Sequence, residues 1–375
     1  MQKVDRAAGT ALVILSLLLW VFLYTNIPKE VTEQSVHLFQ SGLIQSQIIQ
    51  PKTERVTGVT FVGDVLLARD LEKIMQEQQR YYPFYGIYKI LNTDYVFGNF
   101  EASVPKQHIS TPAESLVFSV PSTSVSVLSD VGFTHMSLAN NHTLDFAQEG
   151  YVNTVEVLSN NELEVFGHPK DISPSSVSYI KVGDTNVSVL ALHTLKGFDL
   201  ASTTQLILDM SELSELQIVY IHWGTEYELI HSDRQEKIAH SLIDLGIDIV
   251  IGHHPHVVQD IERYNKGVIF YSLGNFVFDQ YFSEDVQTGL LVNLSKLEKS
   301  FALDFRPVTS IYSPAQPRLM SPSAEADFLA DLANRSATST REEIKSGRIL
   351  IDRINLQYEH GSASMSRPTS TSIDE

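Results

Sequence analysis

The sequence predicts an α/β domain preceded by one transmembrane helix, and three observations lead to this fold class. From Val56 onward, short apolar runs of strand length alternate with amphipathic stretches of helix length, as in layered α/β proteins. Five of the apolar runs lead directly into Asp, Glu, Asn or His. Residues 7–24 form an uncharged apolar stretch that stands apart from this pattern.

The N-terminal stretch has the length of a membrane span. Residues 7–24 follow Lys3 and Arg6 and end in aromatic residues of the kind found at membrane interfaces. A cleaved signal peptide is the alternative, but the residues after Tyr24 offer no small-residue cleavage site. We therefore expect an uncleaved anchor, with residues 1–6 in the cytoplasm and the remainder of the chain outside the cytoplasm.

The chain after the anchor divides into four regions by composition. Residues 25–55 are polar and predict a stalk, and residues 56–310 carry the α/β pattern of a domain. We expect residues 311–358 to be an extension that packs on this domain. Residues 359–375 are rich in Ser and Thr and are expected to be disordered.

The composition excludes several classes of function. The formal net charge of the 375 residues is −18, whereas a sequence-independent nucleic-acid binder needs a basic face to displace counterions from phosphates. The chain has no cysteine. Disulfides, thiolate nucleophiles and cysteine zinc sites are therefore excluded, as is a lipoprotein anchor.

The elements of the domain follow from hydrophobic periodicity and turn residues. The residues Gly183-Asp184-Thr185 predict a hairpin turn between two strands. Strands are predicted at 59–62, 95–97, 134–138, 177–182, 187–192, 217–221, 248–251, 268–272, 288–294 and 348–354. Helices are predicted at 65–79, 122–130, 146–159, 234–245 and 324–334.

Five predicted strands run directly into residues that can bind metal ions. Ligands of open α/β sheets bind beyond the carboxyl ends of the strands, so we expect these side chains to gather in one place. They are Asp64 after the first strand, Asn99 and Glu101 after the second, Asn140, Asn141 and His142 after the third, His222 after the fourth, and His253, His254 and His256 after the fifth.

The residue types predict a divalent metal site. Carboxylate, amide and imidazole ligands suit Mn, Zn or Fe, and six or more candidates exceed the four ligands of one structural zinc. One or two ions are therefore expected, and a pair of ions would neutralise a phosphate and lower the pKa of a bridging water.

Each of these residues alone has a simpler explanation. Asp64 could cap a helix, the Asn and Glu residues could build turns, and His222 could be an ordinary buried histidine. Three histidines within residues 253–256 are rarely needed for packing, so this segment supports the metal site most strongly.

Six segments in a fixed order carry a family resemblance. They are FVGDVLLARD at 61–70, DYVFGNFEASV at 94–104, SLANNHTLDF at 137–146, HWGTEYE at 222–228, DIVIGHHPHVVQ at 248–259 and IFYSLGNFVFDQ at 269–280. Together they resemble the CapA (PGA-cap) family of bacterial capsule synthesis proteins, which is similar to calcineurin-like metallophosphatases. The resemblance implies a four-layer α/β/β/α sandwich and a membrane-bound role in poly-γ-glutamate synthesis and export.

The resemblance also implies a role for each motif residue. His142 would contact a phosphate and protonate the leaving group. The implied metal ligands are Asp64, Glu101 (or less readily Asn99), Asn141, His222, His254 and His256. The chain departs from the metallophosphatase pattern at two points. Leu66 replaces the histidine of the usual Asp-x-His, and Asn99 replaces the aspartate of the usual Gly-Asp, which weakens one metal position.

Four further residues are candidates beside these ligands. Arg69, predicted one helical turn beyond the first ligand, could reach an anionic substrate or could be a surface charge. Asp145 could orient His142, and these three residues form the predicted catalytic set. Asn140 and Asn275 are the candidates for substrate binding, with a turn as the alternative.

Two functions fit these expectations. The first is an extracytoplasmic metal-dependent phosphoesterase. The second is a non-catalytic subunit that binds an anionic polymer such as poly-γ-glutamate and docks other capsule synthesis subunits. The missing histidine of Asp-x-His favours the second function. Because a chain of charge −18 repels an anionic polymer, the contacts would have to be local, at the metals or at Arg69.

Overall fold

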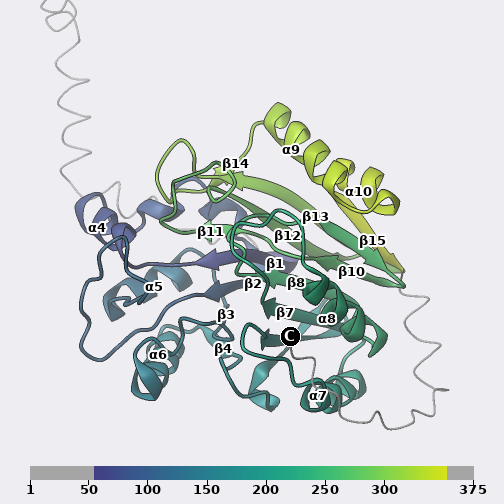
Figure 1. Ribbon diagram of the computed structural model, residues 1–375, viewed down its shortest axis with the longest axis horizontal. Helices are drawn as coiled ribbons and strands as arrows, with labels where there is room; N and C mark the ends of the chain where they lie inside the picture. The colour runs from purple at the N-terminus through teal and green to yellow at the C-terminus, as the bar shows by residue number, and fades with distance from the viewer. Residues whose placement is uncertain (1–54, 353–375) are drawn as a thin grey trace, which may run out of the picture. The chain divides into compact units, whose positions relative to one another are not determined.

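A computed structural model of the protein describes residues 55–352 (Figure 1). The predicted transmembrane helix at 7–24, nearly all of the predicted stalk and the predicted tail at 359–375 lie outside the described residues. Within the part of the chain that is described, no helix is both long and apolar enough to cross a membrane.

Two sheets form the centre of the described domain. The first sheet contains β1 (Val56–Val65), β2 (Thr93–Phe100), β3 (His135–Ser137), β4 (Glu164–Phe166), β11 (Asn275–Val277), β12 (Thr288–Lys296), β13 (Ser300–Thr309), β14 (Arg318–Leu319) and β15 (Arg348–Asp352). Its main strand order is β14-β13-β12-β1-β2-β3-β4, with β11 beside β1 and β15 beside β13. Strands β1 to β4 are parallel, so their carboxyl ends meet at one edge.

The second sheet contains β5 (Val177–Val182), β6 (Thr185–His193), β7 (Leu216–His222), β8 (Ile249–His253), β9 (Ile261–Tyr264) and β10 (Gly267–Phe270). The strand order is β5-β6-β7-β8-β10-β9. Strands β6, β7, β8 and β10 are parallel, whereas β5 and β9 are antiparallel edge strands.

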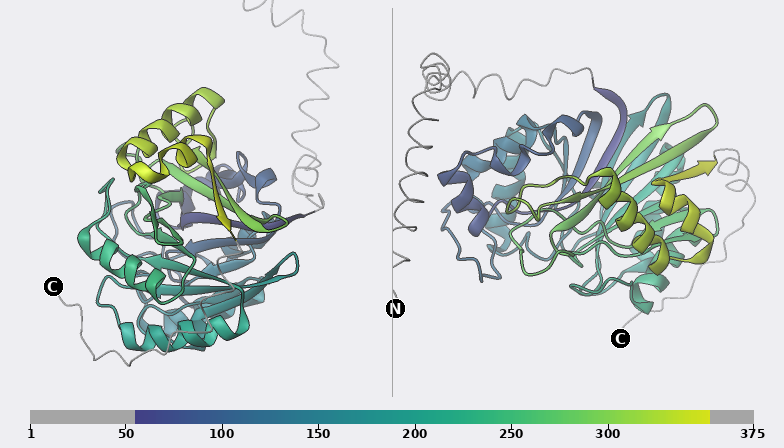
Figure 2. Two further views of the ribbon diagram at one scale, coloured as in Figure 1. Left: turned by 90° about the vertical axis from the view of Figure 1, so that its right-hand side faces the viewer. Right: turned by 90° about the horizontal axis from the view of Figure 1, so that it is seen from above.

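Helices cover the outer faces of both sheets, which gives a mixed α/β sandwich. On the first sheet lie α4 (Asp70–Glu77), α5 (Ser122–Asp130) and α6 (Ala147–Asn160), and on the second lie α7 (Leu200–Leu213) and α8 (Asp233–Asp244). Helices α9 (Pro322–Arg335) and α10 (Arg341–Ser346) pack against β13 and β15, as Figure 2 shows. Short 3-10 turns at Tyr82–Phe84, Tyr88–Ile90, Pro174–Ser176 and Thr338–Thr340 complete the described elements.

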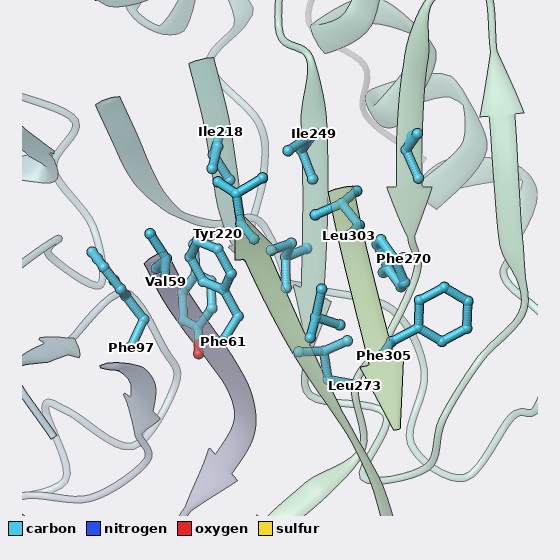
Figure 3. Packing of buried hydrophobic residues seen from close by; sticks show 14 of the residues in the cluster. Val59, Phe61, Phe97, Ile218, Tyr220, Ile249, Phe270, Leu273, Leu303 and Phe305 are labelled. Atoms are coloured by element: carbon cyan, nitrogen blue, oxygen red, sulfur yellow. The ribbon is translucent and has the colours of Figure 1, made fainter. Parts of the chain in front are cut away.

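The core between the two sheets fixes how the sheets lie against each other. Phe61 of β1 packs between Phe97 of β2 and Tyr220 of β7, with ring centroids 5.2 and 6.0 Å apart (Figure 3). The Tyr220 hydroxyl donates a 2.6 Å hydrogen bond across the interface to the Val62 carbonyl. Burying each such large apolar side chain contributes roughly 1.5–3 kcal/mol. The interface therefore holds the carboxyl ends of β1 and β7 at a constant separation.

The predicted helix at 65–79 is wrong in its first part. β1 continues through Val65 and pairs there with β11, in the register Asp64↔Asn275. α4 begins only at Asp70, after Arg69 at a positive φ of 55°. The apolar residues after Asp64 are buried on the sandwich rather than on one helix face, and a short apolar run fits either element. Asp64 is therefore a strand residue and caps no helix.

Most other predicted elements lie within a few residues of the observed bounds, and several elements were not predicted. The hairpin turn at Gly183-Asp184 joins β5 and β6 in the expected register. Helix α7 was missed, although Asp199 caps it by accepting from the backbone N–H groups of Ala201 and Ser202 at 3.1 Å. Also unpredicted were β4, β9, β11, β13, β14 and α10.

The described part of the C-terminal region packs into the domain core. Leu329 and Leu332 of α9 and Ile344 of α10 belong to the same buried cluster as the core between the sheets. β15 adds a strand to β13 in a five-residue antiparallel register. This part of the predicted segment 311–358 therefore completes the sandwich.

Candidate metal centre

The sequence-predicted ligands lie together at the carboxyl ends of strands from both sheets. Asp64 is in β1 and pairs in register with Asn99 of β2. His222 ends β7 and is paired with His253 at the end of β8. Because the sandwich core holds these strands face to face, oxygen ligands from the first sheet meet imidazoles from the second. The side chain of Glu101 lies where they meet.

Glu101 is the central anionic group of the site. Its side chain is completely buried, and neither carboxylate oxygen has a hydrogen-bond partner. The Nε2 atoms of His142, His222 and His256 each lie 3.9 Å from its Oε1. Burial, followed by repulsion from Asp64, raises the pKa of Glu101 well above its usual range. A buried carboxylate surrounded by imidazole nitrogens at this spacing fits a bound cation.

At this site two sets of three residues offer one ligand atom each, and within each set the three atoms lie within 4.8 Å of one another. Both sets contain Glu101, so this carboxylate would be a ligand in either of them. One set is Glu101, His254 and His256, and the other is Asp64, Glu101 and His222. All five residues are buried. Divalent ions such as zinc or manganese bind this mixture of oxygen and nitrogen donors.

Asp64 is held in place by hydrogen bonds. Its Oδ1 accepts from Asn99 Nδ2 at 2.7 Å, and its Oδ2 accepts from the His254 backbone N–H at 3.2 Å. Burial alone would raise its pKa, but interactions with His256 and His253 and the bond from Asn99 outweigh burial and lower it. The carboxylate is therefore maintained as an anion, the form that binds cations.

The β8–β9 loop has a constrained backbone and contains a histidine, His254, whose pKa is strongly lowered. His254 and His256 both adopt positive φ, 95° and 59°, which is uncommon for residues other than glycine and marks local strain. Burial and the neighbouring His256 lower the pKa of His254 to about 3. His256 Nδ1 lies 2.9 Å from Asn275 Oδ1 and donates to it, and its Nε2 lies 3.9 Å from Glu101 Oε1. Neutral imidazoles are the form that coordinates metals.

His142 is oriented by two contacts at the edge of the site. Its Nδ1 lies 3.0 Å from Asp145 Oδ2, and its ring stacks on Phe118 at 3.8 Å. Asp145 also accepts from the Phe118 backbone N–H at 2.7 Å, so all three residues are linked. With Nδ1–H donating to Asp145, Nε2 faces Glu101. The predicted pairing of His142 and Asp145 is therefore present in the structure.

Two residues predicted to bind substrate are engaged in structural hydrogen bonds. The Asn140 amide donates to Asn99 Oδ1 and to the Phe100 carbonyl, and its oxygen accepts from the backbone N–H of His142. Asn140 is fully buried and shapes the loop that presents His142. Asn275 accepts from His256 and donates to the Val286 carbonyl at 2.9 Å. Both amides thus hold neighbouring parts of the site in place, and their predicted role in substrate binding stays a prediction.

Arg69 is not a surface charge, and it does not follow Asp64 on a helix. Its guanidinium forms a buried ion pair with Asp279 and donates to the Ser115 carbonyl at 3.1 Å. It also lies over the Phe118 ring, 4.4 Å from the centroid. Asp279 in turn accepts from the Asp70 backbone N–H at 3.1 Å, at the start of α4. Arg69 thus ties α4 to the loop that supports His142.

Asn141 and Asn99 lie on opposite sides of the His222 ring. His222 Nε2 is 2.7 Å from Asn141 Oδ1, and its Nδ1 is 3.1 Å from Asn99 Nδ2. Asn99 therefore joins Asp64 and His222 through hydrogen bonds from one amide group. Burial and the neighbouring His254 lower the pKa of His222 well below its usual range.

One histidine at the site was missed by the sequence analysis. His193 ends β6 and is paired in register with His222, with ring centroids 5.8 Å apart. Its Nδ1 donates to the Pro169 carbonyl at 2.7 Å, and its Nε2 is buried without a partner. The available signal was the same as for the predicted ligands, because the apolar run of β6 also ends in a histidine.

Comparison with known proteins finds a matching family model and several related sequences. The model of the family described as bacterial capsule synthesis protein PGA_cap matches residues 58–280. The PGA biosynthesis protein CapA of Bacillus subtilis is 33% identical over an alignment of 258 residues, and the match covers 64% of this chain and 68% of the relative. The capsule biosynthesis protein CapA of Bacillus anthracis is 32% identical over an alignment of 263 residues, and the match covers 64% of each chain. The match thus spans about two thirds of either relative.

Solved structures give more distant matches. A phosphatase from Mycoplasma pneumoniae aligns with 70% of this chain and 90% of its own, at 13% identity and a TM-score of 0.41. A protein from Thermus thermophilus aligns with 69% of this chain and 95% of its own, at 16% identity and a TM-score of 0.42.

Proposed function

This chain belongs to the bacterial capsule synthesis protein family PGA_cap, and we propose that it acts in the synthesis or export of a poly-γ-glutamate capsule. Two relatives with about one third identical residues are named as PGA or capsule biosynthesis proteins, which supports this role. In this proposal residues 7–24 anchor the protein in the cell membrane with its N-terminus inside. The domain then lies outside the cell, together with the polymer and the other capsule synthesis subunits.

The working site in this proposal is a divalent metal centre. Glu101 supports it most directly, because a fully buried carboxylate with two unpartnered oxygens is costly unless a cation binds it. Glu101, His254 and His256 would hold one ion, and Asp64, Asn141 and His222 would extend the site beside it. A bound ion of this kind supplies positive charge to a phosphate or carboxylate group of the substrate.

The residues around the ligands would position the substrate and move a proton. His142, with Nδ1 bonded to Asp145, presents Nε2 toward Glu101 and is placed to hold or donate a proton there. Asn275 orients His256 in the same manner. If the reaction is phosphoester hydrolysis, His142 is the group that protonates the leaving oxygen.

Binding of the polymer without hydrolysis is the second candidate function, and Asn99 favours it. Its neutral amide lies between Asp64 and His222 and donates a hydrogen bond to each of them. At this position Asn99 contributes no anionic ligand. A position with fewer anionic ligands holds an ion more weakly. The site would then bind one ion tightly, at Glu101, His254 and His256, and would capture carboxylates of the polymer.

The test combines metal analysis, hydrolysis and capsule formation. The full chain, purified in detergent, should retain divalent metal after dialysis, and Glu101→Gln should lose the metal bound at this centre. Phosphoester hydrolysis is then assayed for the wild type and for His142→Asn, which leaves all metal ligands intact. In capsule-forming cells that lack their own copy, His254→Ala should abolish the polymer.

The variants separate the two candidate functions. Loss of both hydrolysis and capsule in His142→Asn indicates the enzyme. A normal capsule in His142→Asn together with loss in His254→Ala indicates polymer binding at the metal. A wild-type chain that binds no divalent metal, or a normal capsule in Glu101→Gln, refutes the metal centre as the working site.

A further inference from the structure

A second cluster of metal-binding side chains lies outside the centre described above. Glu236 and His240 are four residues apart on α8 and therefore project from one face of the helix. Glu262 on the edge strand β9 faces them. One ligand atom from each of the three residues lies within 4.8 Å of the others. The three side chains are half-buried, so an ion can reach them from solvent.

The ligands are held in place by aromatic neighbours. The Tyr271 hydroxyl donates a 2.6 Å hydrogen bond to Glu262 Oε2, which leaves Oε1 directed at His240. The His240 ring stacks on Tyr264, with centroids 3.6 Å apart and an interplanar angle of 7°. Both side chains are thus oriented before any ion binds, and a site of this kind loses little entropy on binding.

The separation and charge of the ligands suit a divalent ion. His240 Nε2 and Glu262 Oε1 are 3.1 Å apart, close to the roughly 3.3 Å between neighbouring ligands of a tetrahedral zinc at about 2.0–2.1 Å. Glu236 adds a second carboxylate, and the structure records no Lys or Arg ion pair to either carboxylate among the described residues. The two carboxylates beside a single imidazole give the cluster a net negative charge, which attracts a cation.

The cluster joins the two segments that leave the Glu101 centre. α8 follows the loop after His222, and β9 follows the loop that contains His254 and His256. These loops already contact each other, because Gln259 Nε2 donates to the Glu228 carbonyl at 2.8 Å. An ion between α8 and β9 would fix both loops at their far ends.

We propose that Glu236, His240 and Glu262 form a second divalent-cation site that binds zinc or a similar ion and ties α8 to β9. Its three protein ligands leave one coordination position open. The site stabilises the loops that carry His222, His254 and His256 without contributing a ligand to the Glu101 centre. This inference is independent of the proposed capsule function, since it rests on a separate set of residues.

Metal stoichiometry tests the site in a chain whose first centre has been disabled. Glu101 belongs to both ligand sets of that centre, so the full-length Glu101→Gln variant is dialysed against Zn²⁺ and its bound zinc is measured. We expect one equivalent to remain. Adding His240→Gln should remove it, with zinc binding weakened at least about tenfold in calorimetric titration. Zinc should also raise the melting temperature of Glu101→Gln but not that of the double variant.

The chain offers a matched control. His108 Nε2 lies 2.9 Å from Glu72 Oε1, which gives the same pair of groups without a second carboxylate ligand. Adding His108→Gln to Glu101→Gln should leave the zinc equivalent in place. If His240→Gln lowers the melting temperature in EDTA, Glu236→Gln on the helix surface replaces it as the test variant.

The possible outcomes separate this proposal from the first centre. Zinc that persists in the Glu101→Gln/His240→Gln variant, or that is already absent from Glu101→Gln, overturns the second site and leaves the first untouched. If the single variant His240→Gln, which retains Glu101, binds no zinc at all, the second site is supported and the Glu101 centre is refuted.

Discussion

Replacing Glu101 by Gln should stabilise the metal-free protein and destabilise the metal-loaded protein. In the metal-free chain, both Glu101 oxygens are buried without hydrogen bonds. A buried polar group in this state costs about 1–3 kcal/mol. Glutamine has nearly the same shape and cannot ionise, so it removes the cost of burying the charged carboxylate, and we expect the free energy of unfolding to rise by on the order of 1–3 kcal/mol in EDTA at neutral pH.

The same substitution removes the ligand that both metal sets share. At a metal concentration of about 100 times its dissociation constant, wild-type protein should gain about 2.7 kcal/mol of stability. Glu101→Gln should gain none of the stabilisation that comes from this centre, and any gain from a metal site elsewhere is common to both proteins. The order of stability of the two proteins should therefore reverse between EDTA and metal, as measured by urea unfolding followed by circular dichroism.

The pH dependence of the stability difference between wild type and Glu101→Gln tests whether ionisation of Glu101 causes it. Burial and Asp64 raise the pKa of Glu101 in the folded state, so the folded state holds this proton more tightly than the unfolded state. The cost that ionisation of Glu101 adds to the folded state is absent below the unfolded pKa of about 4.3 and grows as the pH rises above it. In EDTA the variant and wild type should thus be equally stable near pH 4 and diverge toward pH 7. A variant that is less stable than wild type in EDTA at pH 7 refutes this reasoning.

Three further predictions concern other buried charges. Arg69→Met should destabilise the protein by about 3–5 kcal/mol because it leaves Asp279 buried and unpaired, and adding Asp279→Asn should restore much of the loss in the same urea assay. Asp145→Asn should lower any phosphoester hydrolysis about 10–100-fold through loss of His142 orientation, with metal content by mass spectrometry unchanged. Burial raises the pKa of Asp248 to about 7, so its ionisation costs stability as the pH rises from about 4 to 7. Asp248→Asn should therefore add on the order of 2–4 kcal/mol at pH 8 and nothing at pH 3.5, and equal effects at both pH values would contradict the assignment.

Much of the α/β alternation was predictable because strand and helix periods differ clearly in this chain. Helix α5 occupies the predicted residues 122–130, and β5 occupies the predicted 177–182. The error at residues 65–79 arose because the residues after Asp64 are apolar without either period. Their strand conformation depends on pairing with β11, more than 200 residues away in sequence. The local sequence pattern contains no information about such a distant partner.

The gathering of the site residues was predictable in outline, and their hydrogen bonds were not. Residues at the carboxyl ends of strands meet in this fold class, which is why Asp64, Glu101 and His222 lie within 4.8 Å of one another. The sequence does not reveal that Asn140 and Asn275 use their amides on neighbouring backbone and side chains. Hydrogen-bond direction depends on loop conformation, as in the strained residues at 254 and 256.

The division of ligands between the sheets has a mechanical consequence. Asp64 lies in β1 and Glu101 directly follows β2 of the first sheet, whereas His222 ends β7 and His256 lies in the loop after β8 of the second sheet. A cation held by both groups would act as a clamp across the sandwich, opposing any sliding of one layer over the other. Core substitutions far from the ligands, such as at Phe61 between the layers, should then weaken metal affinity without touching a single ligand.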